Sequence, residues 1–553
     1  MDRERPRRAM SFERALGGAF LACVFATGPL VFMLIYFASQ FNGLGEPIAL
    51  EQAQLARNIR AGRGFVTDVV TPLSLMRKPD IAHHPDGSNA PLGPLLLALA
   101  FRIGPPSDTT AAVLTAILWY LVLGLTCLFA WRAFGPAVAA FATIVVGINT
   151  TVLTAAVSGT PRMLTTLLCT LMLYVMYELG TAAPGRSSPP ALSPRARAAL
   201  WGGLFALACL ASPLACLLLP GVLLYIWLSR TETRPRSLAC LAGAALVASP
   251  WLLRNTIVFG NPLFSLRWYE LVMFTRSFPA DALLLDYAQP PSPIVFCLTH
   301  PAQVLAKMVT ALGGLRDGLF DTADFYVAAV FIVAAFVRLG DERLERLRLA
   351  VYVMIAATAL GVAATRPTAD AFVPFAPFVS IVASAMFLEQ LSRMQLHFPI
   401  SQYRRMRADI VQWVIILLAL LLLVYPVWMT FQRSKWTRPP PRQPLEPAER
   451  YIDEGKAAVT NMPWDVAWRL NRTGVLAPQT EGEFRRMDAA IGPIDYVVLG
   501  APLRPSPRGE YDLFWLALAD PAPIETQGYK LLTSFEIHPA LRAVIRQRAS
   551  EAQ

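Results

Sequence analysis

The stretch between the first two long apolar runs gathers residue types that bind anions, metal ions and protons. It holds carboxylates, arginines and a histidine pair: Glu46, Glu51, Arg57, Arg60, His83, His84 and Asp86. Arginine side chains bind phosphate groups or anchor a chain at a membrane surface, and both roles are open for Arg57 and Arg60. The two glutamates are either functional or solvated loop charges, and the sequence pattern alone leaves both readings open.

The histidine pair and Asp86 are residue types that ligate metal ions. Adjacent histidines point apart on most backbones, and the sequence offers no third ligand, so we predict no metal site here. Asp86 stands in Pro-Asp-Gly-Ser, which is typical of a turn. The sequence does not require a cofactor, and it leaves open whether a divalent cation takes part.

A helix must position the glutamates and arginines of this stretch. Residues 48–60 have helical spacing, and the glycines after Arg60 predict its end. Glu51 and Arg57 therefore lie on one helix. The apolar segment Leu92–Ile103 is too short to cross a bilayer, and we expect it to lie in the membrane interface.

The composition describes the larger frame that holds this stretch. The chain has 553 residues, a net charge of +11, 55% hydrophobic residues and 16% charged residues. A soluble domain has about 25% charged residues, so the composition excludes a soluble globular enzyme, a disordered chain and a disulfide scaffold. The basic residues are scattered in short clusters between apolar runs, which indicates membrane topology and not nucleic-acid binding.

The apolar runs predict a mainly α-helical, polytopic membrane bundle of about 11 spans. The candidate spans are 15–38, 108–131, 134–154, 160–179, a pair within 199–228, 236–253, 322–338, 347–364, 372–391 and 409–430. With the N-terminus in the cytoplasm, every cytoplasmic segment carries arginine, as the positive-inside rule requires. The bundle then covers residues 1–432, with outer loops at 40–107 and 254–321.

Residues 433–553 are expected to form a small α/β domain on the outer face. Short apolar runs predict strands at Ala457–Thr460, Gly474–Leu476 and Ile494–Leu499, and a helix near Glu481–Ala490. A Pro-rich linker enters this domain. The topology places the C-terminus outside the cell or in the periplasm, and the arginine-rich short loops suit a bacterial plasma membrane.

Three segments carry longer motifs, and each falls on the outer side in the predicted topology. They are Ala56-Arg57-Asn58-Ile59 to Phe65 with His84-Pro85 and Pro91–Leu99, then Pro250–Pro262, then Thr460–Trp468 with Val475–Pro478. Together they resemble the membrane glycosyltransferases of the GT-C superfamily, in the branch of protein O-mannosyltransferases and aminoarabinose transferases (glycosyltransferase family 39). The resemblance covers nearly the whole chain.

The resemblance implies that a sugar moves from a polyprenyl-phosphate donor to an envelope acceptor at the outer membrane face. The acceptor is a lipid, a glycan or a protein, and the reaction inverts the anomeric carbon. In this family a carboxylate of the first outer loop is the base. When the chain is aligned on Ala56-Arg57-Asn58, the position of this carboxylate falls near Ile48. The resemblance therefore implies the neighbouring Glu51 or Glu46 as the base, and Asp86 as a substrate-positioning group. The implied substrate and phosphate ligands are Arg57, Arg60, His83, His84 and Arg254.

Two alternative functions remain open at the level of sequence. An isoleucine at the expected acid position, Ile48, favours a catalytically inactive membrane scaffold or assembly subunit with the same fold. A lipid transporter or flippase is the third reading, but such proteins usually place charges inside their spans, and the spans predicted here contain almost none.

Overall fold

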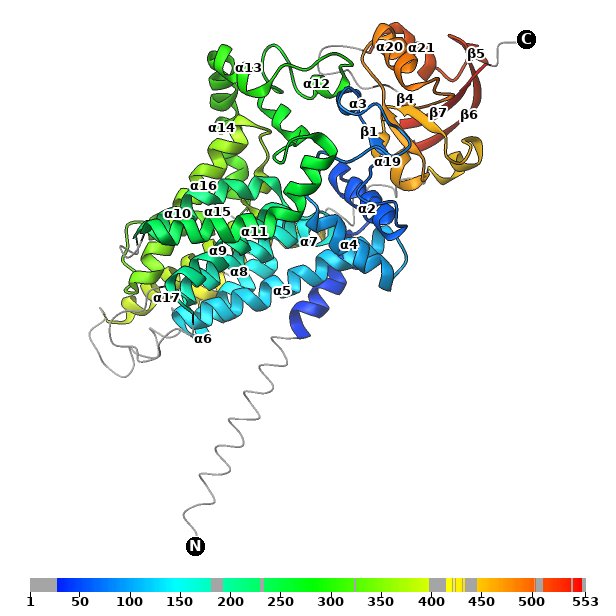
Figure 1. The fold of residues 1–553 in the computed structure, drawn as a ribbon. Coiled ribbons are helices and arrows are strands. Elements are labelled where there is room, and N and C mark those ends of the chain that lie inside the picture. The colour runs from blue at the N-terminus through cyan, green and yellow to red at the C-terminus, as the bar shows by residue number, and fades with distance from the viewer. Residues whose placement is uncertain are drawn as a thin grey trace.

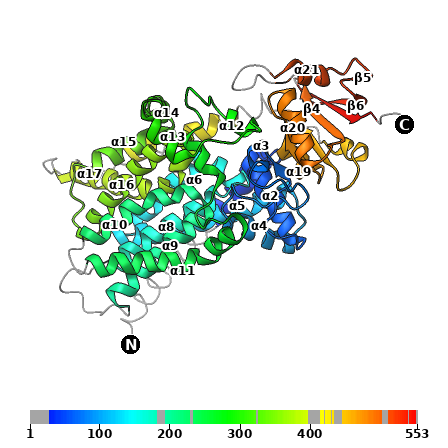
Figure 2. The ribbon, with the colours of Figure 1, turned by 45° about the horizontal axis from the view of Figure 1, so that its top comes forward.

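The computed structural model shows a helical bundle with a sheet-containing domain at one end (Figures 1 and 2). It describes residues 27–180, 192–228, 233–322, 325–396, most of 414–432, 445–501, 503, 511–538 and 541–549. The orange and red C-terminal domain lies in both views beside the blue segment 40–107, which was predicted as the first outer loop and keeps that name. This end of the bundle is where the chemistry-bearing residues of the sequence gather.

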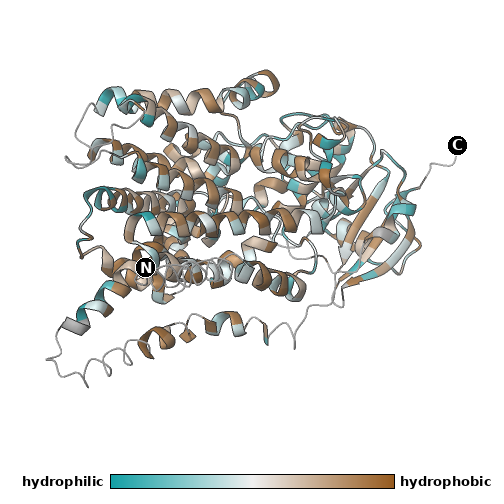
Figure 3. Cartoon of the chain, turned by 90° about the horizontal axis from the view of Figure 1, so that it is seen from below, coloured by the Kyte–Doolittle hydropathy of each residue, from teal (hydrophilic) through white to brown (hydrophobic). Residues whose placement is uncertain are grey.

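The bundle consists of apolar helices around one large hydrophobic core. Its longer helices are α5 (Asp108–Phe134), α6 (Pro136–Ile148), α7 (Thr150–Val157), α8 (Arg162–Glu178), α9 (Pro194–Ala211), α10 (Leu219–Leu228), α11 (Thr233–Phe259), α14 (Pro301–Thr322), α15 (Phe325–Ala334), α16 (Glu342–Ala364) and α17 (Ala376–Leu396). Figure 3 shows that apolar residues dominate these helices along their length. Such helices bury side chains toward one another and present the remaining apolar surface to lipid.

The predicted count of about 11 spans is not confirmed. Within the described residues, four helices are long and apolar enough to cross a membrane, or up to six if each bent pair is one span. Several predicted spans correspond to shorter apolar helices, such as Thr27–Gln40 and Phe325–Ala334. The arginine cluster at positions 3–14, the loop arginines at 404–407 and the proline-rich linker at 438–442 lie outside the described residues.

The segment predicted as the second outer loop, 254–321, differs from the expectation. It holds α13 (Pro293–Thr299) and α14, a bent apolar pair with an angle of 96° between its halves. Pro301 begins α14 directly after the turn at His300, because proline fits the first turn of a helix but not its interior. Because the apolar pattern is interrupted between the two helices, hydropathy did not predict this pair.

The predicted helix at 48–60 is confirmed as α2 (Pro47–Arg60). It packs against α4 (Leu92–Ile103), and both contribute to a small hydrophobic cluster of the first outer loop. Between them the loop forms β1 (Val69–Val70) and α3 (Pro72–Leu75).

The C-terminal domain is built on a seven-stranded sheet of order β1-β3-β2-β4-β7-β6-β5. Its strands are β2 (Ala457–Thr460), β3 (Thr473–Leu476), β4 (Tyr496–Ala501), β5 (Glu525–Thr526), β6 (Tyr529–His538) and β7 (Leu541–Arg548). Its helices are α19 (Pro463–Arg469), α20 (Glu481–Ile491) and α21 (Leu513–Ala519). The three predicted strands and the predicted helix are present, and the antiparallel half of the sheet was not foreseen.

One strand of this sheet comes from the membrane part of the chain. β1 of the first outer loop pairs in parallel with β3, with Val69 opposite Gly474 and Val70 opposite Val475. The backbone amide of Gly474 also donates to the carbonyl of Asp68 over 2.8 Å. The first outer loop and the C-terminal domain are thus joined by a continuous hydrogen-bonded sheet.

Candidate active site

A cavity of about 620 Å³ opens where the first outer loop, the bundle and the C-terminal domain meet. Its wall holds both acidic and basic side chains, among them Glu51, Asp86, Arg162, Arg267, Arg366 and Asp370. These residues come from α2, the loop that follows it, the start of α8, and the segments around 267 and 366–370. The cavity therefore brings together residues from distant parts of the sequence.

Glu51 faces this cavity from α2 and is partly buried. Burial, together with the neighbouring charge of Asp86, raises the pKa of its carboxyl to about 7. Hydrogen bonds from the side chains of Asn89 and Trp464, together with the charge of Arg267, act in the opposite direction. A carboxylate with a pKa near neutrality is well matched to accept a proton from a substrate.

Asp86 lies in the turn that the sequence predicted, and it also lines the cavity. Its Oδ1 accepts from the backbone amides of Ser88 at 3.0 Å and Asn89 at 2.7 Å. Its Oδ2 accepts from the side-chain amide of Asn89 over 3.0 Å. Asn89 in turn bonds Glu51, so Asp86 fixes the residue that orients the Glu51 carboxylate.

Glu46 has a different environment from Glu51. Its carboxylate forms a two-point ion pair with Arg162, at 2.9 and 2.6 Å. The same guanidinium lies 2.6 Å from the carboxylate of Asp370. The carboxylate of Glu46 is therefore ion-paired with an arginine that lines the cavity, an arrangement suited to positioning that arginine.

Arg57 and Arg60 do not line this cavity. Arg57 donates to the carbonyls of Trp468 over 2.8 Å and Ala467 over 2.6 Å, and its guanidinium lies 5.1 Å from the centre of the Trp468 ring. Arg60 is exposed near the end of α2. Arg57 thus ties α2 to the C-terminal domain.

The two histidines have separate environments. His84 is buried and lines the cavity, its Nδ1 lies 2.9 Å from the carbonyl oxygen of Asp80, and burial lowers its pKa. His83 is exposed, and its backbone amide donates to Asp80. Within the described residues, no group of three or more histidine, cysteine or acidic side chains is placed to hold a metal ion.

Arg254 is held among aromatic rings beside the first outer loop. Its guanidinium lies 4.8 Å from the centre of the Trp251 ring and 5.4 Å from that of Phe65, and it donates to the carbonyl of Phe65 over 3.3 Å. It is not part of the cavity wall. The phosphate role of Arg57, Arg60, His83, His84 and Arg254 stays a prediction.

Three arginines that line the cavity were not predicted as site residues from the sequence. Arg162 and Arg366 stand near the ends of apolar runs, where an anchoring role is the ordinary interpretation. Arg267 lies in a short 3-10 helix, Leu266–Leu271, and its Nε donates to the carbonyl of Ser88 over 2.9 Å. The only available signal was an arginine at the outer end of a predicted span, and that signal is weak.

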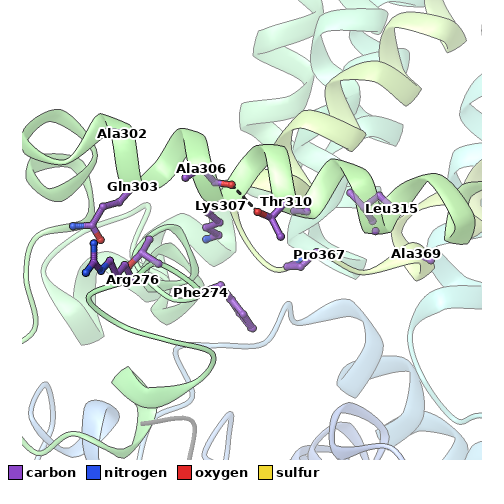
Figure 4. A pocket seen from close by; sticks show the side chains of 13 residues that line it. Phe274, Arg276, Ala302, Gln303, Ala306, Lys307, Thr310, Leu315, Pro367 and Ala369 are labelled. Carbon is purple, nitrogen blue, oxygen red and sulfur yellow. Dashed lines mark hydrogen bonds between the residues drawn. The ribbon is translucent and has the colours of Figure 1, made fainter.

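A second cavity, of about 770 Å³, lies beside α14 (Figure 4). Lys307 projects into it from α14, and its ammonium group donates to the carbonyl of Glu270 over 2.6 Å. The chain segment 366–370 separates the two cavities, since Pro367 and Ala369 line the second while Arg366, Thr368 and Asp370 line the first. A mostly apolar space thus lies next to the charged one.

Solved structures with a similar fold are known, although the sequence itself has no match. No protein-family model and no curated protein matches the sequence. Among solved structures, ArnT from Cupriavidus metallidurans bound to undecaprenyl phosphate is similar, with a TM-score of 0.57, 15% identity, and 96% of this chain and 98% of that chain covered. The archaeal oligosaccharyltransferase AglB from Archaeoglobus fulgidus, in complex with an inhibitory peptide and a dolichol-phosphate, is also similar. Its TM-score is 0.54 at 12% identity, and the match covers 87% of this chain and 70% of that chain.

A third similar structure is the Archaeoglobus fulgidus oligosaccharyltransferase in complex with zinc and sulfate. Its TM-score is 0.50 at 13% identity, and the match covers 85% of this chain and 67% of that chain. These similarities run over most of the present chain, including the helical bundle. The chain therefore has a GT-C-like fold, the fold of the membrane glycosyltransferases ArnT and AglB.

Proposed function

We propose that this protein is a membrane glycosyltransferase that moves a sugar from a polyprenyl-phosphate donor to an envelope acceptor. The reaction takes place at the outer face of a bacterial plasma membrane, with the N-terminus in the cytoplasm and the C-terminal domain outside. The observation that carries this proposal is the cavity in which Glu51, with a pKa of about 7, lies among three arginines on a GT-C-like fold. A base and cationic groups in one cavity are what displacement of a phosphate from a sugar requires.

The proposed reaction is a direct displacement at the anomeric carbon. Glu51 takes the proton of an acceptor hydroxyl or amine as that atom forms its bond to the sugar. The bond between the anomeric carbon and the phosphate oxygen breaks, and its electron pair leaves with the polyprenyl phosphate. Attack from the face opposite the leaving group inverts the anomeric configuration.

Arg267 is the residue we propose to stabilise the departing phosphate. It lines the same cavity as Glu51, and its charge is felt at the Glu51 carboxylate. A guanidinium forms paired hydrogen bonds with phosphate oxygens and keeps its charge at any working pH. The adjoining cavity beside Lys307, with its mainly apolar wall, is suited to a lipid portion of a substrate.

The proposal is tested by transfer from polyprenyl-phosphate sugars in detergent or vesicles. The purified protein is incubated with such donors and with envelope lipids, and products and co-purifying lipids are identified by mass spectrometry. We expect transfer by the natural sequence and none by the triple variant E46Q/E51Q/D86N. The variant E449Q/E454Q, which changes two exposed glutamates of the C-terminal domain, is the matched control.

The transfer rate should rise with pH through about 7. Because the reaction needs the ionised Glu51 carboxylate, protonation below its raised pKa removes the base, and the rate falls as the pH falls. The measurement is kcat/KM between pH 5 and 9, which reports ionisation in the free protein. A rate that is flat across this range, or that falls with increasing pH below 7, would contradict the assignment of Glu51.

The alternative of an inactive scaffold has one specific observation in its favour. Ile48, at the position where the resemblance expects an acid, lines the cavity. Intact transfer by E46Q/E51Q/D86N would contradict the base, whereas binding of polyprenyl phosphate without transfer from any donor by the natural sequence would favour the scaffold.

A further inference from the structure

The C-terminal domain contributes directly to the wall of the charged cavity. Among the described residues that line it, Trp464 and Leu476 belong to this domain, and the others come from the bundle and its outer loops. Trp464 stands in the first turn of α19, immediately after the proline that begins the helix. The indole therefore reaches the cavity from a domain that follows the whole bundle in sequence.

Trp464 makes its polar contact with Glu51. Both side chains line the same cavity, and α19 packs against α2, the helix that carries Glu51. The indole N–H is a donor only, so in the hydrogen bond that lowers the pKa of Glu51 the carboxylate is the acceptor. Asn89, in the loop that follows α2, donates to the same carboxylate. Two neutral donors from separate domains thus hold the carboxylate that faces the cavity.

The helix that carries Trp464 is fixed by several independent contacts. Arg57, on the same helix as Glu51, clamps the last carbonyls of α19. The indole of Trp468 donates to the carboxylate of Asp108 over 2.6 Å, and Arg469 donates to the carbonyl of Leu44 over 3.0 Å. These contacts bind α19 to the first outer loop and to α5, so the position of Trp464 does not depend on its own hydrogen bond.

The sheet fixes the other end of the same helix. β3 passes so close to the start of α19 that a Cβ atom on Gly474 would lie 2.7 Å from the carbonyl oxygen of Pro463. Gly474 is also the residue that pairs with Val69 of the first outer loop. A side chain at this position would push Pro463, and Trp464 with it, away from the cavity.

We propose that Trp464 is a positioning residue for sugar transfer: its indole N–H orients the Glu51 carboxylate at the cavity wall, so that the C-terminal domain completes the catalytic cavity. This inference rests on the proposed function. The physical basis is that a hydrogen bond donated to an ionised carboxylate stabilises the ionised form over the protonated form. The bond from Trp464 opposes burial and the charge of Asp86, which raise the pKa of Glu51, and it acts with the charge of Arg267.

The first test is the pH profile of transfer by W464F, which keeps an aromatic ring and removes the donor. We expect the rising limb of kcat/KM to move upward by about one pH unit, which corresponds to about 1.4 kcal/mol of lost stabilisation of the carboxylate. The control W268F changes an exposed tryptophan outside the cavity wall and should leave the limb in place. An equal loss of rate at every pH in W464F would indicate a merely structural role and overturn the inference.

The second test does not depend on activity. The difference in fluorescence between the natural protein and W464F isolates the emission of Trp464, which should change with pH around a midpoint of about 7 as its partner ionises. The change should disappear in E51Q. Emission that does not titrate, or that titrates equally in E51Q, would overturn the inference even if transfer is observed, whereas absence of transfer with an intact titration would contradict only the proposed function.

Discussion

The variant E51Q is expected to lose sugar transfer by a factor of about 10²–10⁴, the usual contribution of a positioned general base. Glutamine keeps the size of the side chain and can still accept the hydrogen bonds of Asn89 and Trp464 through its carbonyl oxygen. It cannot take a proton from the acceptor. The loss should therefore appear in the rate of transfer and not in the affinity for the carrier lipid.

The measurement has two parts. Initial rates are determined with saturating polyprenyl-phosphate sugar, and binding of polyprenyl phosphate is followed by native mass spectrometry. E454Q, an exposed glutamate of the C-terminal domain, should retain the natural rate. E46Q separates the two candidate bases, because Glu46 is already ion-paired with Arg162 and its loss should affect the rate less than E51Q does. A rate for E51Q within a few-fold of the natural protein would rule out Glu51 as the base.

The sequence predicted the local elements of this site better than their assembly. Helical spacing located α2 and placed Glu51 and Arg57 on it, because periodicity is a local property of the chain. Their roles diverge in the structure, where Glu51 faces the cavity and Arg57 holds α19. No local pattern distinguishes an arginine that binds phosphate from one that caps the carbonyls of a distant helix.

The parts that escaped prediction depend on contacts between distant segments. β1 is a strand of two residues, Val69–Val70, and it exists because β3 offers it an edge. In the sequence, Arg162 is only an arginine near the end of an apolar run. The folded chain brings the carboxylates of Glu46 and Asp370 next to it. Hydropathy gives the apolar segments, but it does not give the angle at which α13 meets α14, and the span count was accordingly not confirmed.

Replacement of Arg546 by methionine should destabilise the C-terminal domain by at least ~3 kcal/mol. Arg546 is fully buried in β7, and its guanidinium donates to the backbone carbonyls of Leu518 at 2.8 Å, Asp520 at 2.5 Å and Pro523 at 3.1 Å. Each hydrogen bond from a charged donor contributes about 1.5 kcal/mol or more. The carbonyl of Leu518 would remain buried without this donor. Methionine fills much of the volume but satisfies none of these acceptors.

The control is R542M, which changes an exposed arginine of the same strand and should be nearly neutral. The full-length protein is heated in detergent and digested briefly with protease, and the midpoint for cleavage of the C-terminal domain should fall by roughly 10–20 °C in R546M. The consequence reaches the cavity, because unfolding of this sheet removes the partner of β1 and the support of Trp464. R546M should therefore lose transfer at temperatures at which its helical bundle is still intact, and a variant that kept full transfer with the domain unfolded would show that the bundle alone forms the working site.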